Sequence, residues 1–238
     1  MEKEIKFYED DIKDMILDKR HIFINKDEKH TILFEKGIAI NSTIADCIIF
    51  SESGHIIGVE IKTERDTVRR LNKQLKNYSL VCDEVYVLCH DDHIDNVEGI
   101  LNRHGHSHVG IISYTEFQGE AVVGVYKEPS KSPTKKVNIA FQMLWRQEIV
   151  QLLGSFKRQV KTLEELGLKT ESVKSRSAGL HGLYVQSNAS KKYLRKTDMI
   201  NMIVNRLGEE ESNMLLCAVF IHKRIHIDRL LKFHHFRA

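Results

Sequence analysis

Two short hydrophobic segments separated by a polar turn constrain the fold of this chain more than any other feature. Residues 44–50 and 56–61 are rich in β-branched and apolar side chains, and the polar stretch Ser51–Gly54 lies between them. Segments of this length and composition around a short glycine-containing link are typical of a β-hairpin. We therefore expect two antiparallel strands, joined by a tight turn, inside the fold.

Charged residues interrupt both of these strands. Asp46 lies in the first strand, and Glu60 lies between Val59 and Ile61 in the second. Antiparallel pairing would bring Asp46 close to Glu60, and Lys62 projects on the same side of its strand as Glu60 because side chains alternate. A charge in a buried strand is costly unless it is paired or bound to a metal. Two neighbouring carboxylates suit a hard divalent cation such as Mg²⁺.

Carboxylates that hold a divalent cation beside a lysine can support hydrolysis of a phosphodiester. The cation activates water and polarises the phosphorus, and a lysine orients the water or neutralises charge on the phosphoryl oxygens. The pattern predicts Asp46 and Glu60 as metal ligands and Lys62 as a catalytic residue, with the backbone carbonyl of Ile61 as a further ligand. A solvated ion pair is the alternative interpretation of Glu60 and Lys62.

A basic amphipathic helix is predicted over residues 66–82. Its apolar residues recur at helical spacing, and Gln74 and Tyr78, four residues apart, share one face. We expect them to reach the metal site or a phosphate, although a surface amide and a core tyrosine would give the same pattern. The residues predicted to bind nucleic acid are Arg69, Arg70 and Lys73.

Taken together, these residues resemble the PD-(D/E)XK nuclease superfamily. Asp46 matches its first acid, Glu60-Ile61-Lys62 its E-x-K element, and Gln74-x-x-x-Tyr78 the Q-x-x-x-Y helix motif of RecB-type nucleases. Residues 60–74 are similar to a bacterial and phage branch with an E-I-K-[ST]-x-x-D-x-x-x-R-L-x-x-Q signature. In that branch a Leu-Trp-Arg tripeptide follows, as at residues 144–146.

The resemblance implies a fold, a cofactor and a further ligand. It implies an α/β, restriction-endonuclease-like core with a mixed central sheet flanked by helices, and dependence on Mg²⁺ or Mn²⁺. The proline that often precedes the first acid is Ala45 here. A further acid is expected from the N-terminal region, and Glu35 is favoured over three acids of the first helix, although a surface carboxylate is equally consistent. The three competing acids are Glu9, Asp10 and Asp11.

Charge is distributed unevenly along the 238 residues. Residues 1–126 hold 15 Lys and Arg against 23 Asp and Glu, a net charge of −8, whereas residues 127–238 hold 21 against 10, a net charge of +11. Phosphate attraction governs non-specific affinity for nucleic acid. The basic half is therefore expected to bind nucleic acid, DNA more readily than RNA, unless it is a solvated basic surface.

Both prolines fall in a polar stretch that predicts a linker over 127–137, between a nuclease-like domain at 1–126 and a basic, mostly helical domain at 138–238. The expected strands are 31–36, 44–50, 56–62, 84–89, 108–113 and 121–126. The expected helices are 5–20, 66–82, 92–103, 138–154, 158–167, 190–207, 210–219 and 225–234, with a loop at 169–190.

Other features narrow the setting of the protein. No apolar run approaches the ~20 residues that a membrane span needs, and no signal peptide opens the chain. Four scattered cysteines favour a reducing cytoplasm. A fold that binds nucleic acid without cutting it, or a phage protein that binds a host partner, would also fit, and the C-terminal helices could form a homodimer or bind a protein partner.

Overall fold

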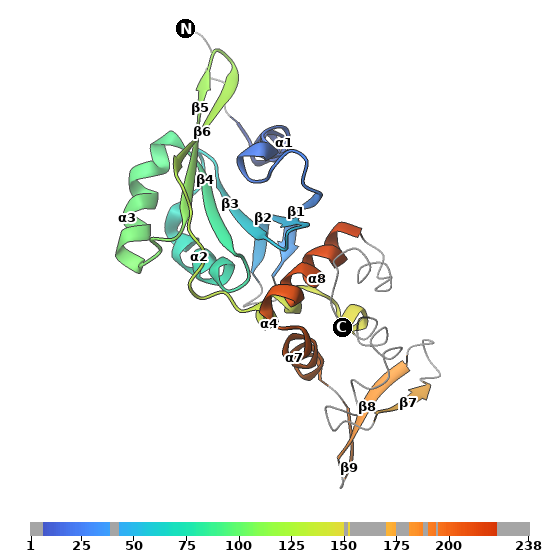
Figure 1. Ribbon diagram of the computed structural model, residues 1–238. Helices are drawn as coiled ribbons and strands as arrows, with labels where there is room; N and C mark the ends of the chain where they lie inside the picture. Colours follow the sequence, from blue (N-terminus) through green and yellow to red (C-terminus); the bar gives the residue numbers. More distant parts are fainter. Residues whose placement is uncertain are drawn as a thin grey trace.

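The computed structural model describes residues 7–38, 43–149, 152 and 195–222, together with the backbone of three strands between 170 and 193. A six-stranded mixed sheet forms its centre, with the strands in sequence order across the sheet (Figure 1). The strands are β1 (His30–Gly37), β2 (Ile44–Ser51), β3 (Ile56–Lys62), β4 (Glu84–His90), β5 (Gly110–Phe117) and β6 (Glu120–Lys127).

The direction of the strands changes across the sheet. The first three strands form an antiparallel meander, β3, β4 and β5 run parallel, and β6 returns antiparallel to β5. The two parallel connections each contain a helix, as parallel crossovers require. These helices are α2 (Leu71–Ser79) and α3 (Ile94–His104).

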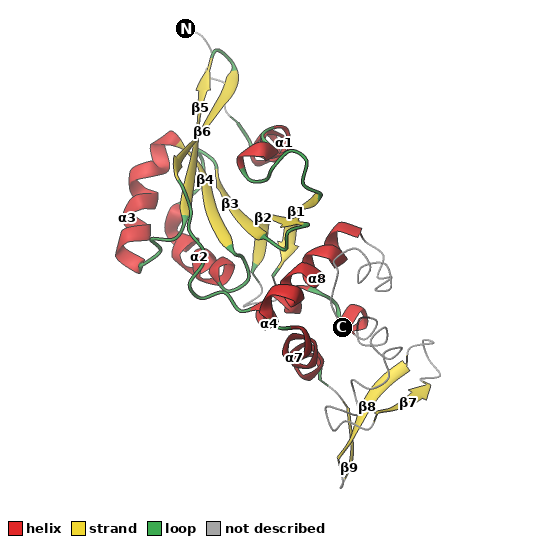
Figure 2. Cartoon of the chain, viewed as in Figure 1, coloured by secondary structure: helices red, strands yellow, loops and turns green. Residues whose placement is uncertain are grey.

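Helices cover both faces of the sheet (Figure 2). The first helix, α1 (Glu9–Asp18), packs on one face, and α2 and α3 lie on the other. The C-terminal region adds α4 (Val137–Ala140), α7 (Lys196–Leu207) and α8 (Glu209–His222) to the face with α2. The expected α/β fold, with a mixed sheet flanked by helices and a helical C-terminal region, is confirmed. Short 3-10 helices are η1 (Arg20–Ile22), η2 (Val68–Arg70), η3 (Asp91–His93) and η4 (Phe141–Met143).

Two predicted helices have different bounds. The helix expected from residue 66 begins as η2 and becomes α-helical only at Leu71, because the Asp66 carboxylate accepts hydrogen bonds from the backbone and hydroxyl of Thr63 and closes a turn. The helix expected over 138–154 is interrupted: Leu144 takes extended backbone angles after η4. A continuous helix over 138–154 would place Trp145 on one apolar stripe with Phe141 and Ile149 and predicts it to be buried, but Trp145 is 76% exposed.

The prediction of a loop over 169–190 is wrong. A second, three-stranded antiparallel sheet crosses this region, and the helix expected from residue 190 begins at Lys196. Its strands are β7 (Thr170–Lys174), β8 (His181–Ser187) and β9 (Ser190–Tyr193). The serine and glycine content suggested a loop, but His181–Ser187 also contains the β-forming run Leu183-Tyr184-Val185. The helices expected at 158–167 and 225–234 lie outside the described residues.

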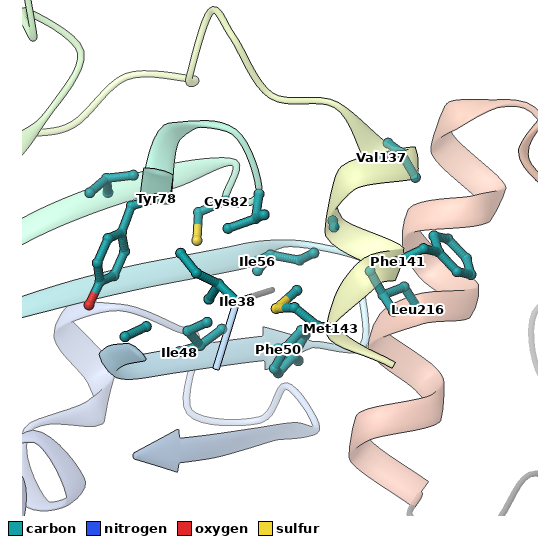
Figure 3. Packing of buried hydrophobic residues seen from close by; sticks show 14 of the residues in the cluster. Ile38, Ile48, Phe50, Ile56, Tyr78, Cys82, Val137, Phe141, Met143 and Leu216 are labelled. Atoms are coloured by element: carbon teal, nitrogen blue, oxygen red, sulfur yellow. The ribbon is translucent and has the colours of Figure 1, made fainter. Parts of the chain in front are cut away.

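One large hydrophobic cluster joins the two halves of the chain. It contains sheet residues such as Ile48, Phe50 and Ile56, and also Phe141 and Leu216 from the C-terminal region (Figure 3). A second cluster, on the opposite face, packs Ile12 and Ile16 of α1 against the sheet. The division into two domains stays a prediction, but the C-terminal helices bury their apolar side chains in the same core as the sheet.

The stretch predicted as a linker is anchored to the sheet. The backbone N–H of Ser132 donates to the carbonyl of Asp83 at 2.7 Å, and that of Lys136 donates to the carbonyl of Leu80 at 3.1 Å. The Lys135 ammonium forms a buried ion pair with the Asp83 carboxylate at 2.5 Å. The same carboxylate accepts from the Ile56 N–H at 2.9 Å and from the Asn213 amide of α8 at 3.1 Å.

Asp83 therefore connects β3, the 127–137 segment and α8. We expect Asp83→Ala to lower the free energy of unfolding by about 3–5 kcal/mol, because it leaves the Lys135 charge buried without its partner. The exposed Asp91 provides the control, since Asp91→Ala should change this free energy by no more than about 0.5 kcal/mol. Urea denaturation of both variants measures the difference, and equal losses would contradict this role of Asp83.

Candidate functional site

Asp46 and Glu60 lie beside each other at one end of the sheet. Cys47 is paired with Val59 in the antiparallel register of β2 and β3, so continuing the register places Asp46 opposite Glu60. The Asp46 side chain reaches β3, where its Oδ2 accepts the backbone N–H of Ile61 at 2.8 Å. The sequence prediction that these two acids approach each other agrees with this register.

The Glu60 carboxylate is buried and only partly satisfied. Glu60 is 0% exposed, and its Oε1 accepts hydrogen bonds from the Lys62 ammonium, at 2.5 Å, and from the Gln74 side-chain amide. Glu60 Oε2 and Gln74 Oε1 are buried without a hydrogen-bond partner among the described residues. A buried carboxylate oxygen without a donor costs free energy, so a ligand at Glu60 Oε2 would stabilise the folded chain.

Tyr78 connects α2 to the two acids. Its hydroxyl accepts the backbone N–H of Asp46 at 2.8 Å and donates to the carbonyl of Val59 at 3.5 Å. Figure 3 shows its ring at the edge of the large cluster, with the hydroxyl directed away from Cys82. A Cβ at Gly58 would overlap the Tyr78 ring and lie 2.8 Å from Cys82 Sγ, so only glycine lets α2 approach β3 this closely.

Burial and the charges of neighbouring acids both change the pKa values of Asp46 and Tyr78. Burial and, to a smaller extent, the neighbouring Glu60 charge raise the pKa of Asp46 to about 7, although the Ile61 N–H and Lys62 act in the opposite direction. Burial also raises the pKa of Tyr78 well above its usual value, again with contributions from Glu60 and Asp46. Perturbed ionisation of this kind is typical of functional sites.

The donor set fits a hard divalent cation. Asp46 and Glu60 supply carboxylate oxygens, Glu60 Oε2 has no protein donor, and the amide oxygen of Gln74 is close by. Across the described part of the chain, no three His, Cys, Asp or Glu side chains group as a metal site, so a cation here would depend on two carboxylates completed by neutral oxygens or water. The Ile61 N–H is used by Asp46, and its carbonyl as a ligand stays a prediction.

Glu35 is not brought into this group. It takes the left-handed conformation, with φ of 52°, and its side chain is 70% exposed and bonded to Lys13 of α1 at 2.8 Å. Its role as a metal ligand stays a prediction. Glu9, one of the competing acids, pairs with the same lysine: its carboxylate lies 3.0 Å from the Lys13 ammonium. The charge of Glu9 also contributes to the raised pKa of Asp46. The sequence patterns did not predict that Lys13 pairs with both acids, although its position four residues after Glu9 is the spacing of an ion pair on a helix.

The predicted nucleic-acid contacts lie on an exposed surface near the site. Arg69 and Arg70 belong to η2, Lys73 lies in the first turn of α2, and all three side chains are exposed. Gln74 follows Lys73 directly, so this basic surface begins one residue from a side chain that binds Glu60. The structure is consistent with these residues meeting a phosphate backbone, and that role stays a prediction.

An open cavity of about 1230 Å³ lies away from this group, at the other end of the sheet. Its lining includes the β2–β3 turn at Gly54 and His55, the start of β4 at Asp83 and Glu84, and the first turn of α8. None of the predicted site residues lines it. Asp46 and Glu60 lie at the opposite end of β2 and β3 from this cavity.

Comparison with known proteins assigns the chain to a family without assigning it a chemistry. A family model described as bacteriophage P4 protein cII matches residues 2–215, so the chain belongs to that family. A comparison with curated proteins gives no match. The solved structure of the SPO1766 protein of unknown function from Silicibacter pomeroyi is similar over 58% of this chain and 82% of that chain, with 9% identity and a TM-score of 0.34. A similarity of that size carries no argument.

The raised pKa of Asp46 predicts how stability depends on pH. Its carboxyl binds a proton more tightly in the folded protein than in the unfolded chain, so its ionisation should lower the free energy of unfolding as the pH rises from 3.8 to about 7. Asp46→Asn keeps an acceptor for the Ile61 N–H and removes the charge. We expect this variant to be more stable than the wild type at pH 8 and to lose this part of the pH dependence.

Urea denaturation at several pH values between 4 and 8 measures both effects, with Asp10→Asn as the control because Asp10 is an exposed acid of α1. A wild type and an Asp46→Asn variant that follow parallel pH profiles would show that Asp46 ionises normally.

Proposed function

We propose that this member of the bacteriophage P4 cII family is a metal-dependent nuclease that hydrolyses phosphodiester bonds, with DNA as the first substrate to test. One observation carries the proposal: a fully buried glutamate, Glu60, has one oxygen held by Lys62 and Gln74 and the other without a donor, beside a second acid, Asp46, that is partly buried. A pair of carboxylates of which one is fully buried is costly unless positive charge offsets it, and Lys62 supplies a single positive charge for the two.

Asp46 and Glu60 would hold Mg²⁺ or Mn²⁺. When bound, the cation would supply an activated water and polarise the phosphoryl group. Asp46 must be ionised to serve as a ligand, so its pKa of about 7 makes cation binding weaker below neutral pH. The Ile61 N–H fixes the direction of the Asp46 side chain, and the Tyr78 hydroxyl fixes the backbone on which it is carried.

Lys62 is the residue that would contact the reacting groups. An ammonium has three N–H donors, and the structure uses one of them for Glu60 Oε1. The others can orient a water or neutralise charge on the phosphoryl oxygens as it develops. Gln74 is a positioning residue: its amide holds the same carboxylate oxygen as Lys62 and so fixes the angle of the Glu60 carboxylate.

Charge supports nucleic acid as the substrate. The basic half of the chain carries a net charge of +11, which offsets the repulsion between a phosphate backbone and the acidic half. Arg69, Arg70 and Lys73 place cations directly beside Gln74. All four cysteines are free and buried, which supports a cytoplasmic setting in the proposal. None of the helices in the described residues is long and apolar enough to cross a membrane.

A cleavage assay with DNA and Mg²⁺ tests the proposal. Glu60→Gln and Lys62→Met should each reduce the rate about 10²- to 10³-fold, because each removes a charge that acts on the reacting groups. Asp95→Asn and Lys26→Met remove the same kinds of charge from exposed positions and should leave the rate unchanged. Addition of EDTA should abolish cleavage by the wild type.

Wild-type rates in both site variants would contradict the proposal and point to a contaminating nuclease. Binding of DNA without any Mg²⁺-dependent product would also overturn it, and would favour a nuclease-like fold that only binds nucleic acid.

A further inference from the structure

Trp145 is the most exposed large apolar side chain of the described residues, at 76% exposure. Its backbone is nevertheless held firmly. The preceding Leu144 and the later Ile149 are buried in the large cluster, and the Trp145 N–H donates to Glu148 Oε2 at 2.5 Å. An indole on a fixed backbone presents a flat aromatic surface to solvent at little cost in conformational entropy.

Two lysines from distant parts of the chain converge just before this tryptophan. Lys36 of β1 donates to the carbonyl of Met143 at 3.3 Å, and Lys196 of α7 donates to the carbonyl of Gln142 at 2.7 Å. These carbonyls belong to adjacent residues, so the two ammonium groups lie close together. Lys36 also lies over the Phe220 ring, 5.1 Å from its centroid.

This pair of like charges is costly as it stands. Burial lowers the pKa of Lys36 and of Lys196, and for Lys196 the charge of Lys36 adds to the effect. Glu148 acts in the opposite direction on both. The nearby Arg195 is committed to Asp198 through two contacts of 3.1 Å. Glu148 is the acid that acts on both lysines, and a phosphodiester, which carries a single negative charge, would add a second.

The backbone of Lys36 lies beside the strand that carries Asp46. Lys36 is paired with Ala45 in the register of β1 and β2, and Ala45 directly precedes Asp46. Its ammonium is directed toward Phe220, whose ring stacks on Phe50 at the other end of β2, with the ring centroids 4.1 Å apart.

We propose that Trp145, Lys36 and Lys196 form a platform for single-stranded nucleic acid, in which the indole stacks on an unpaired base and the two lysines contact the adjacent phosphate. The proposal takes nucleic acid as the ligand from the proposed function and names its single-stranded form as the substrate class. Bases in a duplex have both faces covered by their neighbours, whereas an unpaired base can stack on an aromatic side chain whatever its identity.

The chain contains one tryptophan, so tryptophan fluorescence reports on Trp145 alone. The full chain, without divalent cations, is titrated with an oligothymidylate, an oligouridylate and a DNA duplex of equal length. Single strands should quench the emission to saturation, and the duplex should quench it much less. The two single strands compare DNA with RNA as ligands of the same platform. The proposal would be overturned if neither single strand quenched the emission, or if the duplex quenched it as strongly as the single strands.

Variants separate stacking from charge. Trp145→Ala should weaken binding of a labelled single strand at least about fivefold, and Trp145→Phe, which keeps a ring, should weaken it less. The double variant Lys36→Gln/Lys196→Gln should lower the slope of log affinity against log salt by about 1. Phe117→Ala is the matched control, because Phe117 is also exposed, at 61%, but lies on the β5–β6 hairpin. An equal effect of Phe117→Ala and Trp145→Ala would contradict the platform.

The titration, repeated in the Glu60→Gln protein and compared with the cleavage assay of the wild type, distinguishes this proposal from the proposed function. Quenching without cleavage in the wild type would support the platform and overturn the nuclease. Cleavage by the wild type without quenching by a single strand would leave the nuclease and overturn the platform.

Discussion

The constraint on which the rest depends is a fully buried carboxylate, Glu60, beside the partly buried carboxylate of Asp46. Glu60 has no exposed surface, and burial with the Glu60 charge moves the pKa of Asp46 to about 7. A protein under selection for stability alone would replace such a pair with apolar side chains, as buried ion groups often permit. Lys62 and Gln74 compensate only one of the Glu60 oxygens. A ligand that carries positive charge, as proposed, would offset the remaining free-energy cost.

The fold around this pair holds it in place from three directions. β2 and β3 set the separation of the two acids through their register, α2 supplies Gln74 and Tyr78, and Gly58 permits the close approach of that helix. The C-terminal helices complete the same hydrophobic core that supports these strands. The strands that carry the site are therefore supported by residues from both halves of the chain, among them Phe141 and Leu216.

Sequence patterns predicted the sheet and its central acids because they depend on local alternation and strand order. The parallel crossovers also follow from alternating strands and helices. The features that the sequence patterns did not predict depend on tertiary contacts and on where the chain turns. Trp145 fitted a buried helical stripe, but the chain turns at Leu144 and leaves it in solvent. The pairing of Glu35 with Lys13 of α1 was also not evident from the sequence, and its role as a ligand stays a prediction. The strands within 170–193 were hidden by serines and glycines that usually mark loops.

The most direct measurement is the ionisation of Asp46 itself, followed by carboxyl ¹³C NMR with and without Mg²⁺. The account predicts a pKa of about 7 for Asp46 in the absence of Mg²⁺, and a marked fall in that pKa when Mg²⁺ is added, because the cation favours the ionised carboxylate. A pKa near 3.8 that does not respond to Mg²⁺ would contradict the claim that these buried acids share a cation.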